Sequence, residues 1–198
     1  MNQPPSLSKT QLRRQLRALL ANVTPAQRAA WSGAIGARLL SLPQVQTARS
    51  IFCYISAADE IDTRELLTHL LAQGKTVAVP LIVGPRQMQA HIITSLADCA
   101  PGAFGLLAPT ATRPLPGDPE IAITPGLAFT PSGARLGKAG GYYDAFLAAH
   151  PATLALALAL DVQVIPDIPM TPTDHYIQMV VTPTRTILCP GRAAAHNA

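Results

Sequence analysis

The sequence has few charged residues and few aromatic ones. Asp, Glu, Lys and Arg make up 13% of the 198 residues and Phe, Trp and Tyr 5%, whereas apolar residues make up 48%. This apolar content excludes an intrinsically disordered chain. The net charge of +4 is modest, and the basic residues beyond the N-terminal segment are dispersed with few aromatics among them. We therefore expect no nucleic-acid partner.

Long apolar runs and cysteine motifs are also missing. The longest apolar stretch, TLALALAL at 153–160, is much shorter than the roughly 20 residues that cross a bilayer, so we expect no membrane association. The first 20 residues are basic and lack the uninterrupted apolar core of a secretory signal. Cys53, Cys99 and Cys189 lack the spacing of a zinc site or disulfide framework. Together these absences predict a cytoplasmic protein with reduced thiols.

The sequence does contain a glycine-rich loop with two cations, RLGKAGGYYD at 135–144. An apolar run at 121–124 precedes it and a helical pattern follows it, which gives the order strand, loop, helix. Glycine lets backbone N–H groups approach a ligand closely, and a helix N-terminus attracts anions. The loop therefore predicts a nucleotide phosphate site, with a glycine-rich surface turn as the alternative. It is neither a Walker A loop nor a GxGxxG motif.

Helical patterns alternate with short apolar runs along the rest of the chain. A basic amphipathic helix is predicted at 7–21, with leucines 7, 12, 16, 19 and 20 on one face. Thr24, Pro25 and Gln27 predict a capped second helix, and Asp62 and Glu65 a third that Gly74 ends. Strands are predicted at 51–56, 76–83, 88–94, 121–124, 153–159 and 180–182. Continuously apolar strands between helices indicate a mainly parallel sheet covered on both faces. The length suits a single domain at 1–189, followed by a frayed tail at 190–198.

The glycine loop resembles the signature of the 5-formyltetrahydrofolate cyclo-ligase family, also called 5,10-methenyltetrahydrofolate synthetases. In that signature Arg, Gly, a basic residue, a glycine-rich stretch, two tyrosines and an Asp occur in this order.

The resemblance extends beyond the loop. Lys9 and Arg13 resemble the family's N-terminal KxxxR pair, and YISAADEIDT at 54–63 resembles its segment with Glu and Thr. ALALDVQVIPDIPMTPTDHYIQMVVT at 157–182 is similar to its closing pattern. The resemblance implies a three-layer α/β/α sandwich of the NagB/RpiA/CoA-transferase-like kind, as a monomer or weak homodimer.

The resemblance also implies a reaction. 5-Formyltetrahydrofolate would cyclise to 5,10-methenyltetrahydrofolate with release of ADP and phosphate, using ATP and magnesium. An N-formyl group is a poor electrophile with a poor leaving group, and attack of its oxygen on the γ-phosphate would remove both difficulties. Because phosphoryl transfer depends on positioning and charge stabilisation, the protein must supply cations and a metal.

The family roles fall on named residues of this chain. Residues implied to bind ATP are Lys9, Arg13, Arg135, Gly137, Lys138, Ala139, Gly140, Gly141 and Tyr143. Residues implied to take part in catalysis are Arg135, Lys138 and Tyr142, those implied to bind folate are Glu60, Phe104 and Tyr142, and those implied to hold magnesium are Asp144 and Asp174. Each role has a structural alternative. Lys9 and Arg13 could belong to a solvated basic face, and Glu60 could be an exposed charge. The aromatic residues could be core packing, and Asp144 could be a helix-start acid.

The chain departs from the family pattern at three positions. Ala139 stands where relatives usually have glycine, Ala108 where many bacterial relatives have glutamate, and Gln178 where a second acid often follows. One alternative function is therefore a non-catalytic module that binds nucleotides or sugar phosphates on the same scaffold. Another is an RNA-associated regulator that uses the basic N-terminal helix, which the scarcity of interleaved aromatics disfavours.

Overall fold

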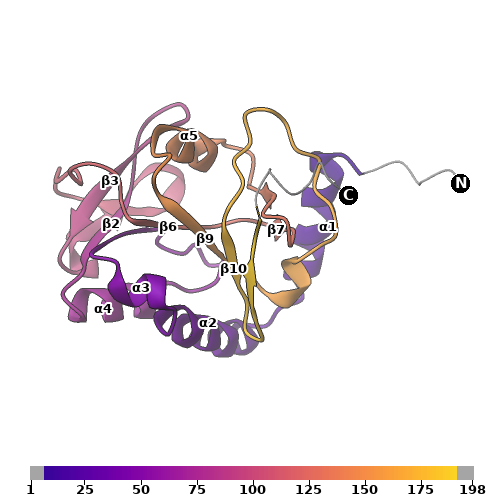
Figure 1. Ribbon diagram of the computed structural model, residues 1–198, viewed down its shortest axis with the longest axis horizontal. Coiled ribbons are helices and arrows are strands. Elements are labelled where there is room, and N and C mark those ends of the chain that lie inside the picture. Colours follow the sequence, from indigo (N-terminus) through magenta and orange to yellow (C-terminus); the bar gives the residue numbers. More distant parts are fainter. Residues whose placement is uncertain (1–6, 191–198) are drawn as a thin grey trace, which may run out of the picture.

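A seven-stranded sheet forms the centre of the computed structural model, which describes residues 7–190 (Figure 1). Its strand order is β11-β10-β9-β6-β1-β2-β3. The strands are β1 (Ser50–Cys53), β2 (Thr76–Gly84), β3 (Gln87–Ile93), β6 (Ile121–Thr124), β9 (Leu154–Leu158), β10 (Met179–Val181) and β11 (Thr186–Leu188). The inner pairs from β10 to β2 are parallel, and the edge strands β3 and β11 are antiparallel to their neighbours. The predicted mainly parallel sheet is confirmed.

Helices cover both faces of this sheet. The helices are α1 (Lys9–Leu20), α2 (Pro25–Leu40), α3 (Pro43–Thr47), α4 (Arg64–Ala72) and α5 (Tyr142–Ala149). Figure 1 shows α2, α3 and α4 on one side of the sheet and α5 on the other. The fold is therefore a three-layer α/β/α arrangement, as expected. No helix between residues 7 and 190 is long and apolar enough to cross a membrane.

Capping boxes start the first two helices. Ser8 caps α1 together with Gln11, and Thr24 caps α2 together with Gln27, each pair joining side chain to backbone in both directions. The predicted start of α4 is wrong by one residue, because the helix begins after Thr63 and not after Asp62. Asp62 accepts a hydrogen bond from the Arg64 backbone N–H and does not form a capping box with Glu65. The short Asp62 side chain thus bonds to the backbone two residues on, as aspartate often does in turns, and does not cap the helix.

The apolar face of α1 is narrower than predicted. Leu12, Leu16 and Leu20 are buried, but Leu7 is 38% exposed and Leu19 45%. Leu7 precedes the helix, and Leu19 lies outside the row at four-residue spacing that faces the core. The buried stripe is enough to fix α1 against the rest of the fold.

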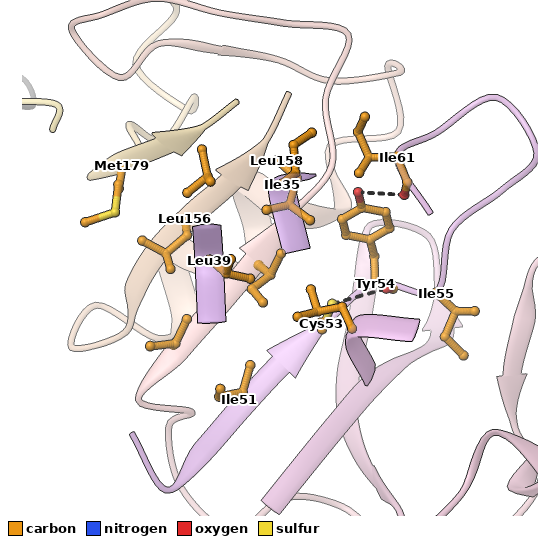
Figure 2. Packing of buried hydrophobic residues seen from close by; sticks show 14 of the residues in the cluster. Ile35, Leu39, Ile51, Cys53, Tyr54, Ile55, Ile61, Leu156, Leu158 and Met179 are labelled. Atoms are coloured by element: carbon orange, nitrogen blue, oxygen red, sulfur yellow. Dashed lines mark hydrogen bonds between the residues drawn. The ribbon is translucent and has the colours of Figure 1, made fainter. Parts of the chain in front are cut away.

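Side chains alternate between the two faces of the strands. Ile51 and Cys53 belong to the cluster beneath α2, where Figure 2 shows Ile35 and Leu39 of the helix next to β9 residues. Phe52 points the other way and stacks on Phe146 of α5, with ring centroids 4.3 Å apart. Both faces of the sheet are thus covered by packed side chains and shielded from water, which explains why the strand sequences are continuously apolar.

The strand predicted at 51–56 ends earlier, at Cys53. The chain then continues as a buried irregular segment, in which the Tyr54 hydroxyl donates to the Ile61 carbonyl over 3.2 Å (Figure 2). The Thr63 hydroxyl donates to the Tyr54 carbonyl over 2.8 Å. These bonds replace the strand ladder and hold the 54–63 segment at the end of the sheet.

Several small elements were not predicted. They are the hairpin of β4 (Cys99–Pro101) with β5 (Leu107–Pro109), the hairpin of β7 (Ala128–Phe129) with β8 (Arg135–Leu136), the edge strand β11, the short α3, and 3-10 turns at Leu96–Asp98, Ala103–Gly105 and Asp161–Gln163. The β7–β8 hairpin carries Arg135, and the β4–β5 hairpin packs beside β2. Both hairpins flank the site described next. The predicted tail lies outside the described residues, apart from Pro190.

Candidate active site

A cavity of about 780 Å³ lies beyond the carboxyl ends of β1 and β6. In parallel α/β sheets this is the usual place for a ligand. The predicted site residues that line the cavity are Lys9, Arg13, Glu60, Arg135, Gly137, Lys138, Ala139, Gly140, Gly141, Tyr142, Tyr143, Asp144 and Asp174. Residues up to 165 positions apart in sequence therefore share one site. The side chain of Phe104 lies outside the described part of the chain, so its predicted role is untested.

The glycine loop forms one wall of the cavity and leads directly into α5. Arg13 of α1 donates from Nε to the Gly137 carbonyl over 2.9 Å, which ties the N-terminal helix to the start of the loop. Ala139 has φ 103° and Gly141, the N-cap of α5, has φ 67°. Positive φ is unfavourable for a residue with a β-carbon, so the alanine is strained where glycine would not be.

Arg135 is the most buried cation of the site. Its side chain is 3% exposed, and Nη2 donates to Asp144 Oδ1 over 2.8 Å while Nη1 donates to the Pro125 carbonyl over 3.3 Å. The guanidinium carbon lies 5.7 Å from the centre of the Tyr143 ring, within cation–π range. Its buried Nε has no hydrogen-bond partner among residues 7–190. An oxyanion in the cavity is the kind of group that could satisfy such a donor.

Lys138 reaches across the cavity to the 54–63 segment. Its Nζ lies 2.8 Å from Asp59 Oδ1 and 3.0 Å from Glu60 Oε1. Burial acts to lower the pKa of Lys138, but hydrogen bonds and charge from the two acids outweigh it and raise that pKa above its usual value. Glu60 is only 14% exposed, and its Oε2 accepts the Ala57 backbone N–H over 2.9 Å. It is therefore a pocket residue, not an exposed charge.

Asp174 pairs with Lys9 of α1 and also accepts from the Thr171 hydroxyl over 2.8 Å. Burial acts to raise the pKa of this carboxyl, but the hydrogen bonds from Lys9 and Thr171 and the lysine charge hold it below its usual range. All of these bonds end on Oδ2. The other oxygen, Oδ1, is thus left for a further partner.

Within residues 7–190 no three His, Cys, Asp or Glu side chains gather as a ready-made metal cage. Asp144 and Asp174 nevertheless both line the cavity, and each uses one oxygen for its bonds to the protein. Magnesium typically takes one or two carboxylates together with substrate phosphates and water. The donor set therefore fits magnesium brought in with a nucleotide.

We call this charged side of the cavity the cation wall: Lys9, Arg13, Arg135 and Lys138 with the acids Asp144 and Asp174. The same cavity is also lined by apolar residues, which we call the apolar wall: Pro80, Leu81, Ile82, Met88, Ala103, Leu106, Leu107 and Ala108. Leu106 is 38% exposed although it is a large apolar residue. The sequence analysis missed this wall, since apolar residues in strands suggest core packing. The signal that could have found it is the scarcity of charge around the β4–β5 hairpin.

Comparison with known proteins agrees with this geometry. The model of the 5-formyltetrahydrofolate cyclo-ligase family matches residues 5–183. The 5-formyltetrahydrofolate cyclo-ligase of Mycolicibacterium smegmatis is 32% identical, covering 91% of this chain and 96% of its own. The mitochondrial enzyme of that name from Arabidopsis thaliana is 28% identical over 93% of this chain and 77% of its own.

A solved structure gives the same result at the level of the fold. The 5,10-methenyltetrahydrofolate synthetase of Aquifex aeolicus superposes with a TM-score of 0.82 at 27% identity, covering 96% of this chain and 97% of that one. The chain therefore belongs to the 5-formyltetrahydrofolate cyclo-ligase family of ligases.

Proposed function

We propose that this protein closes 5-formyltetrahydrofolate to 5,10-methenyltetrahydrofolate at the cavity, at the expense of ATP bound with magnesium. Family membership gives the cyclisation itself. The observation that carries the assignment to this site is the meeting of a cation wall and an apolar wall around about 780 Å³. A nucleotide triphosphate needs the first wall and a folate ring system needs the second.

The chemistry requires that the formyl oxygen become a leaving group. That oxygen attacks the γ-phosphorus and ADP departs; the neighbouring aniline-type nitrogen then adds to the formyl carbon and loses its proton. Phosphate leaves with the formyl oxygen, so the new C–N bond replaces a C–O bond. The protein has to hold the two reactants in line and stabilise charge on phosphate oxygens, which fixed cations do without any covalent step.

The cation wall provides such charge in a preset geometry. Arg135 is held by Asp144, the Pro125 carbonyl and the ring of Tyr143, so its guanidinium needs little rearrangement to meet a phosphate. Lys138 is held by Asp59 and Glu60 and would exchange part of that contact for phosphate oxygens. In this proposal Lys9 and Arg13 approach the same phosphates from α1.

Magnesium would be held by Asp144 and Asp174, and when bound it neutralises the charge that develops on the phosphate chain. His175 donates its backbone N–H to Asp144 Oδ1 over 3.2 Å, so the segment that carries Asp174 is tied to the aspartate of α5. That bond keeps the two carboxylates on one side of the cavity.

The folate would lie along the apolar wall, with Glu60 and Tyr142 as its polar anchors. Glu60 is fixed by the Ala57 backbone N–H, which leaves its carboxylate oriented into the cavity beside Lys138. We further propose that the partners are ATP and the folate, without nucleic acid or membrane, and that the protein works in the cytoplasm as a monomer or weak homodimer.

The proposal is tested with the purified protein, magnesium ATP and 5-formyltetrahydrofolate, by following the absorbance of the methenyl product. We expect product only when ATP and a divalent metal are both present, with one phosphate released per product. A folded protein that binds ATP but yields no methenyl product would instead be the non-catalytic nucleotide-binding module.

A further inference from the structure

The cavity is lined by a fifth cation, Arg86, at the tip of the β2–β3 hairpin. Three of the five lining cations face acids: Lys9 pairs with Asp174, Arg135 with Asp144 and Lys138 with Asp59 and Glu60. Arg13 and Arg86 have no acidic partner within residues 7–190. These two guanidiniums therefore carry the uncompensated charge of the cavity.

Arg13 and Arg86 lie at opposite ends of the glycine loop. Arg13 donates to the carbonyl of Gly137, the first glycine of the loop. Arg86 lies against Gly141, the last one: a β-carbon on Gly141 would lie 3.0 Å from Arg86 Nε and 3.3 Å from its Nη2. Two guanidiniums from separate elements thus bracket the segment that leads into α5.

Arg86 adds a second source of positive charge at the start of α5. Gly141 is the N-cap of α5, and a helix N-terminus carries a partial positive charge. In the described part of the chain Arg86 has no acidic partner beside that end, so an anion placed between the two would be attracted by both. A phosphate that accepts from the loop N–H groups would meet the guanidinium fork of Arg86 on the same side.

The backbone at Arg86 supports a functional reason for this side chain. Gly84 pairs with Gln87, so Pro85 and Arg86 form a two-residue turn, and Arg86 has φ 56°. After a proline, this second turn position usually holds glycine or asparagine, which tolerate positive φ. Strained non-glycine residues gather at functional sites.

From this geometry we infer that Arg86 binds a phosphate group of the nucleotide and, with Arg13, clamps it over the glycine loop. The inference rests on the proposed function, because it assigns Arg86 to the ATP of that reaction. The ligand chemistry is an oxyanion, and the carboxylates of the folate's glutamate tail are the competing source. Proximity to Gly141 and the α5 N-terminus favours phosphate.

The test is a calorimetric titration of ATP, adenosine and 5-formyltetrahydrofolate into the wild type and the variant Arg86→Asn, which keeps a residue suited to positive φ. We expect the variant to bind ATP about tenfold more weakly, because it loses one charge-assisted contact at a partly exposed site. Adenosine and folate binding should not change, and Arg86→Lys should recover part of the loss. Arg49→Asn, which removes an exposed cation at the Glu120 surface, serves as the charge control.

Thermal unfolding separates binding from folding in the same variants. Asparagine relieves the turn, so Arg86→Asn should unfold at the wild-type temperature or slightly above it. Unchanged ATP affinity in this variant, or a loss confined to folate, would overturn the inference and leave the proposed function intact. A wild type that binds no ATP would overturn both.

Discussion

The two walls of the cavity are built in different ways. The cation wall consists of side chains from α1, β8, the glycine loop, α5 and the segment before β10, each held by a named partner, such as Arg135 by Asp144 and Lys9 by Asp174. The apolar wall comes from the paired strands β2 and β3 and from the β4–β5 hairpin, and its side chains are apolar. Substitutions in the cation wall should therefore lower turnover, whereas substitutions in the apolar wall should weaken substrate binding.

The largest effect is expected for Asp144→Asn. The change removes a proposed magnesium ligand and the charge opposite Arg135, so turnover should fall by about 100-fold or more and the magnesium requirement should rise. Because Arg135 is buried, the free energy of unfolding should also fall, by on the order of 2 kcal/mol. Steady-state kinetics and urea unfolding measure the two effects.

Glu65→Gln is the matched control for this variant, since Glu65 is also a first-turn helix acid but does not line the cavity. Its turnover should equal that of the wild type. Wild-type kinetics in Asp144→Asn as well would mean that the aspartate is merely a helix-start residue.

A second change in the cation wall, Asp174→Asn, should reduce turnover by about tenfold and make stability less sensitive to acid. The folded pKa of Asp174 is depressed, so its stabilisation is present above the unfolded pKa of about 3.9 and is lost as the pH falls through the folded pKa. The wild type should be more stable than the variant at pH 7, and the gap should shrink below about pH 4.

Urea unfolding of both proteins from pH 7 to pH 3 measures that gap. A gap that stays constant over this range would show that the carboxylate charge of Asp174 contributes nothing to stability.

The apolar wall should respond through affinity. Leu106→Asn replaces a partly exposed leucine, so the fold should tolerate it, whereas the KM for folate should rise by about tenfold from the loss of apolar burial. The KM for ATP should not change. Leu188→Asn is the control, because Leu188 is 71% exposed and lies outside the cavity. Equal changes in both KM values would remove the distinction between the walls.

The smallest effect is expected for Ala139→Gly in the glycine loop. Since φ is 103° at this position, glycine should relieve strain of about 1 kcal/mol and allow closer approach of backbone N–H groups, tightening ATP binding by several-fold. Ala111→Gly, at an exposed site without positive φ, should only lower stability slightly. Equal or weaker ATP binding by Ala139→Gly would mean that the loop has accommodated the alanine.

The sequence predicted the cation wall far better than the apolar one. Cations and acids at fixed spacings around glycines carry a local signal, and α1 is recognisable from its leucines. The partners of those charges were not predictable, because Lys138 finds Asp59 and Lys9 finds Asp174 only through the fold. Leu81 and Leu106 have no signal that separates a cavity wall from a core. Arg86 was missed because its meaning depends on Gly141, which lies 55 positions away in sequence.

The central claim is that ATP on the cation wall and the folate on the apolar wall react through the formyl oxygen. That oxygen attacks the γ-phosphorus and leaves as part of the released phosphate. The most direct measurement uses 5-formyltetrahydrofolate labelled with ¹⁸O in the formyl group, turned over with unlabelled magnesium ATP, with the released phosphate analysed by mass spectrometry. The account predicts one ¹⁸O atom in each phosphate. Methenyl product accompanied by unlabelled phosphate would contradict it, because the formyl oxygen would then have left without ever reaching the nucleotide.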